Sequence, residues 1–425
     1  MISRVTNWLN GQDSRYIFLL LLLVVLPSFE APKNLFALLY VVSWLVIAYR
    51  EKNWGGKWRI IDTVILFFFF GNIVVSLNAV ITYNLSAGGM NDLIRFLLIV
   101  WVLSRHILTK NQIVTLCMVA VFSTAISLIY SYLMCPPESC PSYLELYSVG
   151  HVNHTAIYLV IAYSIALSLL LTNFFVLLNY QRVLLILSTL FIAYAAIDSN
   201  SRAASGILVL VTSISLSYAV FKYKSSRFRL GVLSFLIFSS FLVISNPPSV
   251  IEKFKTSESL FDEPERKKIR NFAYYTFKTS PLLGVGFGNF GNLRHEYIKD
   301  KVIEDLGVFE KEKYSLNAHT HNVYYNFLVS GGIVMLSALL WFWIQIIVSI
   351  WKVSKENDRK ELRYIDDVEV IEYRDDRLLI LSSSMVFLIV LSMGFVNTTL
   401  SHEHAILSMF VLGLLLSKDR ELNAK

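Results

Sequence analysis

Charged residues are scarce in this chain of 425 residues: Asp, Glu, Lys and Arg make up only 16% of it, while 55% is hydrophobic. The mean hydropathy of +0.56 lies outside the range of a soluble domain of this length. The shortage of charge therefore excludes an ordinary soluble enzyme and indicates a membrane protein. The sequence shows neither an internal repeat nor a low-complexity segment.

Cysteine is rare as well, with three residues in the whole chain. Cys117 lies inside a predicted membrane span, where we expect it to be inert. Cys135 and Cys140 flank Pro-Pro-Glu-Ser in a predicted outer loop, where oxidation is permitted. A disulfide there would staple the loop, and the sequence leaves open whether it forms.

Long apolar runs recur along the chain and predict about twelve transmembrane helices, because roughly 20 apolar residues cross about 30 Å of hydrocarbon. The first run leads directly into further spans, so we expect no cleavable signal peptide. The fold class is therefore an all-α polytopic membrane protein. The predicted spans are 16–29, 34–49, 60–83, 91–103, 113–133, 155–178, 183–196, 203–221, 230–244, 322–350, 378–395 and 405–416.

Lys and Arg predict the orientation of these spans. With the N-terminus inside, inner segments hold 23 of the 38 basic residues, and the short outer loops hold only Lys33 and Arg202. Twelve more lie in one long outer loop, about 245–320, which crosses the membrane regardless of its charge. The net charge of +7 therefore indicates anchoring to anionic lipid on the cytoplasmic side and no nucleic-acid partner.

Three domains follow from this layout: 1–245 with transmembrane helices 1–9, 246–320 as a periplasmic loop, and 321–425 with helices 10–12 and a cytoplasmic tail. Within the loop, a helix is predicted from Pro264, with acidic residues in its first turn and an end before Ser280-Pro281. Its apolar residues recur at helical spacing, so one face should lie on protein or on the membrane surface. These residues are Ile269, Phe272, Ala273 and Phe277.

Histidines are distributed unevenly, since seven of the eight fall on the predicted outer side. An imidazole titrates near neutral pH and can take a proton from a hydroxyl group. His321 stands at the start of the tenth span, where Asn322 can cap the helix. We predict that His321 is a general base; the alternative is a helix-start histidine bonded to backbone. His319 would point elsewhere on an extended segment and is the weaker candidate.

Other histidines open helices on the same side. His151 and His154 open the sixth span, and Ser401-His-Glu-His opens the twelfth. Imidazole is a good zinc ligand, but paired His-x-His motifs alone are a weak signal, and the outer side lacks a tight carboxylate or cysteine set. We therefore predict neither a metal nor another cofactor. The four histidines weighed as metal ligands are His319, His321, His402 and His404.

Arg202 lies in a short polar link between two apolar runs, on the side where basic residues are scarce. A guanidinium at membrane depth is costly and usually has an anionic partner. The functional interpretation is a phosphate clamp, because Arg forms paired bonds to phosphate oxygens. The alternative is a helix-end arginine that reaches for lipid head groups or for Asp198.

Basic residues also gather in the predicted loop helix, at Arg266, Lys267, Lys268 and Arg270. They could bind a lipid-linked phosphate or form a solvated helix face. Arg95, one turn into the fourth span, could add its positive charge to the donor-binding residues or pair with Asp92. The glycine-rich stretch 284–291 is not followed by Lys-Ser/Thr, so we interpret it as a flexible turn and not as a nucleotide-binding loop.

These motifs, in this order, resemble the O-antigen ligase and polymerase superfamily of bacterial inner-membrane proteins. The resemblance covers the central third to half of the chain. It is carried by the small residues after Ser201-Arg202, the stretch from Arg266 through Pro281-Leu-Leu-Gly-Val-Gly-Phe-Gly-Asn-Phe, His319-Thr-His-Asn followed by Gly331-Gly332, and Gly150-His-Val-Asn-His. The family often carries an aromatic residue four positions after its loop arginine, where Arg270 stands here. The 15-residue spacing to Pro281 favours Arg266 for the family role.

The resemblance implies a membrane glycosyltransferase (GT-C-like) fold with a long periplasmic loop over the site, in a multi-pass protein of the bacterial inner membrane. The implied donor is a glycan on undecaprenyl pyrophosphate. The implied acceptor is lipid A–core in a ligase, or another glycan chain in a polymerase. Family members of this kind need neither ATP nor a metal.

By this resemblance, His321 would deprotonate the acceptor sugar hydroxyl, and Arg202 and Arg266 would hold the departing pyrophosphate. Direct displacement would invert the anomeric carbon. We predict an O-antigen ligase, with the polymerase of the same superfamily as the nearest alternative. A glycolipid flippase or exporter is more distant, because such proteins are expected to carry charged residues on mid-membrane helices and often repeated halves.

Overall fold

The computed structural model describes residues 13–134, 144–174, 176–199, 201–222, 264–316, 319–366 and 376–423. Throughout these residues the fold is helical, and the sole β-bridge joins Leu146 to Gly150. The predicted ninth span at 230–244 and the cysteines at 135 and 140 lie outside the described residues. Cys117 is buried within a long helix, as expected.

Eleven helices of the described residues form the bundle, and each except α14 matches a predicted span to within about six residues at its ends. In chain order they are α2 (Ser14–Val25), α3 (Glu30–Arg50), α4 (Ile60–Tyr83), α5 (Met90–Ser104), α6 (Lys110–Met134), α7 (Val152–Asn173), α8 (Asn179–Asp198), α9 (Arg202–Lys222), α14 (Val323–Asp366), α15 (Arg377–Met393) and α16 (His402–Leu422).

Seven of these described helices are long and apolar enough to cross a membrane: α3, α4, α6, α7, α8, α9 and α14. The others fall short for physical reasons. α2, α5 and α15 are only 12, 15 and 17 residues long, and α16 ends in Lys418, Asp419 and Arg420. The chain is thus a polytopic helical membrane protein by length and composition of its helices.

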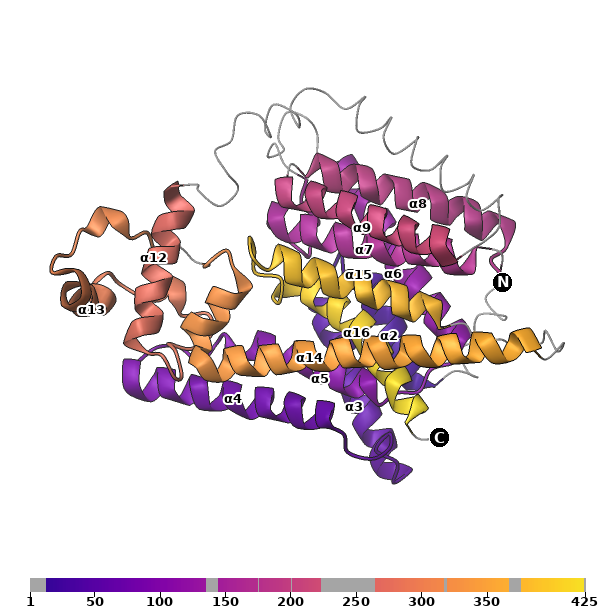
Figure 1. The fold of residues 1–425 in the computed structure, drawn as a ribbon, viewed down its shortest axis with the longest axis horizontal. Coiled ribbons are helices and arrows are strands. Elements are labelled where there is room, and N and C mark those ends of the chain that lie inside the picture. The colour runs from indigo at the N-terminus through magenta and orange to yellow at the C-terminus, as the bar shows by residue number, and fades with distance from the viewer. Residues whose placement is uncertain are drawn as a thin grey trace.

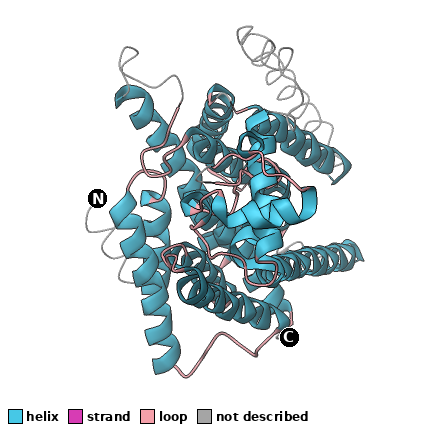
Figure 2. Cartoon of the chain, turned by 90° about the vertical axis from the view of Figure 1, so that its left-hand side faces the viewer, coloured by secondary structure: helices cyan, strands magenta, loops and turns pink. Residues whose placement is uncertain are grey.

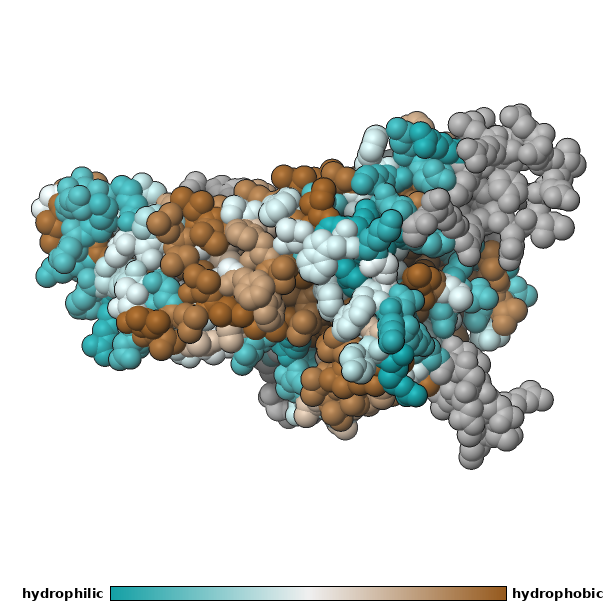
Figure 3. Space-filling view, turned by 90° about the horizontal axis from the view of Figure 1, so that it is seen from below, coloured by the Kyte–Doolittle hydropathy of each residue, from teal (hydrophilic) through white to brown (hydrophobic). Residues whose placement is uncertain are grey.

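α4, α8, α9, α14 and α15 run along the long axis of the molecule, and α3 and α16 are tilted from it (Figure 1). We call the end where α7, α9, α14 and α16 begin the outer end, and the opposite end the inner end. Hydrophobic residues gather in a broad zone between two hydrophilic ends (Figure 3), as expected for a protein that exposes its flank to lipid. α7 and α16 lie at the centre and are almost wholly buried. α7 packs against α6, α8, α9 and α15, and α16 packs against α5, α14 and α15.

Beyond the outer end, α12 (Pro264–Thr279) and α13 (Glu296–Leu306) form a separate small layer with the short helices η1 (Phe290–Asn292) and η2 (Lys311–Lys313). α12 begins at Pro264 and ends before Ser280-Pro281, as the sequence predicts. Its apolar face packs into a core of its own, and the loops of this layer lie over the ends of the bundle helices (Figure 2). That core includes Ile269, Phe272, Phe290, Ile298 and Tyr314.

α14 differs in two ways from the predicted span 322–350. It has 44 residues, about 66 Å at 1.5 Å per residue, so the helix continues to Asp366, beyond the predicted end at 350. It is also interrupted at Gly332, whose φ of 61° and ψ of −161° only glycine adopts without strain.

The glycine-rich stretch fills this interruption and is an ordered packing element, not a flexible turn. The N–H groups of Val285 and Gly286 donate to the carbonyls of Val329 and Ser330 at 2.9 and 2.8 Å, and Ile333 N–H donates to Pro281 O at 2.9 Å. A Cβ on Gly332 would collide with the Leu282 carbonyl. Backbone groups released by the break in α14 are therefore bonded within the protein, as an apolar surrounding demands. We call this contact the glycine seam.

Candidate functional site

His321 is held at the start of α14 by hydrogen bonds of its two neighbours. Thr320 Oγ1 donates to Asn322 O at 2.8 Å, and Asn322 Oδ1 accepts from Tyr325 N–H at 2.9 Å, which makes Asn322 the predicted cap of the helix. Asn322 Nδ2 also donates to Phe395 O at 2.9 Å, and Val323 N–H donates to Gly394 O at 2.8 Å. The end of α15 thus anchors the segment that carries His321.

The backbone of His321 has a φ of 50°, in the left-handed region that non-glycine residues seldom occupy. Such conformations cost about 1 kcal/mol or more and persist where the surroundings hold them, commonly at functional sites. Here the bonds of Thr320 and Asn322 supply that hold. The backbone at His321 is therefore held in place by the contacts of its two neighbours.

Arg202 is the first residue of α9 and is half-buried at the outer end. Asp198, the acid that the sequence offered as a partner, accepts a hydrogen bond from Tyr132 Oη at 2.7 Å instead. Within the described part of the chain, no hydrogen bond or ion pair of Arg202 is found. A half-buried guanidinium without an acidic partner is costly, and an anionic ligand would compensate it.

The basic cluster of α12 divides into two kinds of residue. Arg266 and Arg270 are half-buried and stand one turn apart, so they share one side of the helix. Lys267 is exposed, and Lys268 pairs with Glu265 of its own helix at 3.0 Å. Two guanidinium groups on one side, close to the chain segment that leads to α14, suit an anionic group with several oxygens.

Arg95 forms the ion pair with Asp92 that the sequence offered as the alternative to ligand binding. Its guanidinium pairs with Asp92 at 2.9 Å and donates to Asn34 Oδ1, which ties the start of α5 to the start of α3.

Lys33, close to Arg95, was not among the candidate site residues predicted from the sequence. This lysine is almost fully buried and forms ion pairs with Glu30 and Glu403, and it donates to Ser148 Oγ at 3.2 Å. The one signal in the sequence was a lysine in a short outer loop.

Five histidines meet at the outer end, although they come from three distant parts of the chain. The ring centroid of buried His154 lies 4.4 Å from that of His402, 5.1 Å from His404, 5.9 Å from His151 and 6.4 Å from His319. His404 Nε2–H donates to Thr398 O at 3.1 Å. We call this group the histidine cluster. The sequence analysis named all five members, in separate motifs, and did not predict that His404 stacks on His154.

The cluster is not arranged as a metal centre in the residues described. There, no group of three or more His, Cys, Asp or Glu side chains is placed to hold a metal ion, so the weighed set of His319, His321, His402 and His404 does not assemble. Although the side chain of His319 is exposed in part, desolvation lowers its pKa, and the neighbouring His151 lowers it further. His319 therefore stays neutral at pH 7 and can accept a proton.

Residues 183–340 match a protein family described as O-antigen ligase. The matched segment runs from the first turn of α8 through α9 and α12 to the middle of α14, so it contains Arg202, Arg266 and His321 as well as the glycine seam. The histidines of α7 and α16 lie outside it. No curated protein matches the chain.

Proposed function

We propose, from the premise that the chain belongs to the O-antigen ligase family, that it is an O-antigen ligase: it transfers O-polysaccharide from undecaprenyl pyrophosphate to a sugar hydroxyl of lipid A–core in lipopolysaccharide biosynthesis. Family membership implies a glycosyltransferase reaction on lipid-linked glycans. The observation that carries the finer proposal is Arg202, half-buried at the outer end without an acidic partner among the described residues.

In this proposal His321 is the general base. Its Nε2 or Nδ1 lone pair takes the proton from the acceptor hydroxyl as the oxygen attacks the anomeric carbon. The bond from that carbon to the pyrophosphate oxygen breaks, and attack from the opposite side inverts the configuration. General bases typically contribute about 10²–10⁴-fold to a rate.

Arg202 and Arg266 bind the pyrophosphate in the proposed complex and stabilise the charge that develops as it leaves. Arg270, one turn from Arg266, extends this anion-binding surface. The proposed arrangement supplies its positive charge from side chains, so the reaction is expected to be metal-independent. The site faces the periplasm of a bacterial inner membrane, in agreement with the distribution of Lys and Arg.

The test uses His321→Asn, because asparagine tolerates a positive φ and should leave the start of α14 folded. Purified protein in liposomes is given lipid-linked O-polysaccharide and lipid A–core, and products are separated on gels. We expect transfer to fall at least about 100-fold with an unchanged melting temperature, and less than about tenfold for His319→Ala. Near-normal transfer by His321→Asn would refute the assignment.

A lipopolysaccharide gel from a deletion strain separates the ligase from the polymerase, since the family includes both. Loss of the long-chain ladder with accumulation of lipid-linked polysaccharide is the result expected of the ligase. A single-repeat band would show the polymerase instead. If the chain were an exporter, its deletion would leave unlinked product on the inner side of the membrane. The position of the candidate polar groups at the outer end does not favour an exporter.

A further inference from the structure

A cavity of about 630 Å³ lies at the inner end, far along the helices from His321. It is bounded by the link before α6, the first turn of α6, the end of α7, the start of α15 and the end of α16. None of the residues assigned to glycan transfer lines it. The proposed function leaves this cavity unexplained.

Both signs of charge line the cavity. Lys418 is nine-tenths buried, and its Nζ lies 3.2 Å from Asp376 Oδ1 and 3.1 Å from Glu421 Oε2. Lys110 stands exposed at the rim. Among the described residues of the lining, two ammonium groups and two carboxylates sum to no net charge, so a ligand with a single sign of charge would meet repulsion as well as attraction.

The rest of the wall is apolar. Ile107 is 68% exposed in spite of its position beside charged residues, and Ile113 and Leu379 continue the same wall. An exposed isoleucine next to the ends of membrane helices lies where acyl chains meet head groups. The cavity thus offers a polar floor and an apolar flank, which suits an amphiphile.

We propose that this cavity binds one phospholipid whose head group carries a phosphate and a primary ammonium. The phosphate lies toward Lys110 and Lys418, the ammonium lies toward Asp376 and Glu421, and one acyl chain lies along Ile107. A quaternary ammonium is a poorer match, because its recognition relies on aromatic rings, and none of the described residues that line the cavity is aromatic. A purely anionic head group would bring its charge against two carboxylates.

The full chain is reconstituted in phosphatidylcholine liposomes with a trace of phosphatidylethanolamine that carries a photoreactive acyl chain. After illumination, crosslinked peptides are mapped by mass spectrometry, and parallel samples carry phosphatidylglycerol or phosphatidylcholine probes with the same chain. We expect the ethanolamine lipid to crosslink to 107–114 and 376–379 at least about fivefold more than either other probe.

Lys110→Glu tests the contact without disturbing the buried ion pairs, because Lys110 is exposed. It should lower the ethanolamine crosslink about fivefold, while Lys355→Glu, an exposed lysine of α14 outside the cavity, should leave it unchanged. Equal crosslinking of the phosphatidylcholine probe would show ordinary lipid contact and overturn the proposal. Preference for phosphatidylglycerol, or no crosslink in these segments, would overturn it as well.

Discussion

At the scale of single residues, Arg202 and Arg266 differ from Lys267 and Lys313 by their surroundings. Both are half-buried, and Arg202 has no acidic partner in the part of the chain that the structure describes. Lys267 and Lys313 are exposed, and Lys313 pairs with Glu310 at 2.8 Å. Burial favours a guanidinium, which is weakly hydrated and binds phosphate by two parallel bonds.

We therefore expect Arg202→Lys and Arg266→Lys each to lower glycan transfer by about tenfold or more, because an ammonium keeps the charge and loses the paired bonds. Initial rates in liposomes measure this. Lys267→Ala and Lys313→Ala are the controls and should change the rate less than about twofold. Full activity in both Arg→Lys variants would show that these arginines are ordinary surface charges.

His319 predicts a pH effect. Its pKa is lowered by burial and by His151, so the folded chain binds this proton less tightly than the unfolded chain, whose histidine pKa is about 6.5. The contribution to stability is then complete above that value and is lost as the pH falls through the folded-state pKa. A proton on His319 would also place a charge on a ring whose centroid lies 6.4 Å from that of buried His154.

The melting temperature should therefore fall between pH 7.5 and pH 5, and it should fall less in His319→Gln, which cannot take the proton. Thermal unfolding in detergent measures both. His295→Gln is the comparison, since that ring bonds Tyr314 O in the outer layer and lies outside the cluster. An identical pH dependence in wild type and His319→Gln would contradict this account.

At the scale of elements, the glycine seam joins the outer layer to α14. Gly332 combines a positive φ with a site where a Cβ would collide with Leu282 O. We expect Gly332→Ala to cost about 1–3 kcal/mol from strain alone and to displace 281–286 from α14, with loss of transfer. Thermal unfolding and the liposome assay give the two readouts.

Gly206 provides the matched control, because it is exposed in α9 and a Cβ there would meet nothing within 4 Å. Gly206→Ala should stabilise the chain by about 0.5–1 kcal/mol, since alanine favours helix. If both substitutions had the same small effect, the seam would not be an essential contact.

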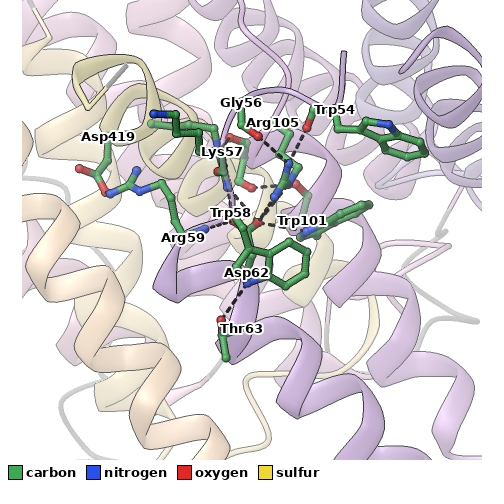
Figure 4. Close-up of polar contacts among 12 residues, drawn as sticks. Trp54, Gly56, Lys57, Trp58, Arg59, Asp62, Thr63, Trp101, Arg105 and Asp419 are labelled. Atoms are coloured by element: carbon green, nitrogen blue, oxygen red, sulfur yellow. Dashed lines mark hydrogen bonds and ion pairs between the residues drawn. The ribbon is translucent and has the colours of Figure 1, made fainter. Parts of the chain in front are cut away.

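At the scale of the whole molecule, a buried charge network closes the inner end (Figure 4). Asp62 of α4 is fully buried and accepts bonds from Arg105 at 2.9 Å and from Arg420 at 2.8 Å, while Arg59 pairs with Asp419 at 2.7 Å. These residues join α4 and the end of α5 to the end of α16, which lies hundreds of residues later in the chain. Removal of one partner would leave the others buried and uncompensated.

Asp62→Asn should accordingly destabilise the chain by about 3–5 kcal/mol. The control is Asp358→Asn, whose ion pair with Lys222 at 2.9 Å has side chains 56% and 26% exposed, and which should cost less than about 1 kcal/mol. Denaturation in detergent compares the two. Equal stability of both variants would mean that the network contributes no more than a surface pair.

Orientation is also a property of the whole chain. We expect Lys299→Cys, exposed on α13, to react with a membrane-impermeant maleimide in intact cells, and Lys355→Cys, exposed on α14, to react only after permeabilisation. The background carries alanine at 117, 135 and 140. Labelling of both positions from the same side of the membrane would contradict the proposed orientation of the chain and, with it, the placement of the site.

The sequence by itself determined the features that depend on local periodicity and local chemistry. Apolar runs of membrane length predicted the helices, Pro264 and Asn322 predicted two helix starts, and the motif order predicted the family resemblance. The signals for the helices and their starts each lie within about 25 residues of chain, where hydrophobic burial and capping act directly.

Only the tertiary structure decided which distant residues meet. His154, His319 and His404 come together across some 250 positions, Lys33 meets Glu403, and Asp62 meets Arg420. The same holds for the glycine seam, which periodicity alone presented as a flexible turn. The physical reason is that partner choice among buried polar groups depends on how helices pack, and a helix of one period can pack against many neighbours.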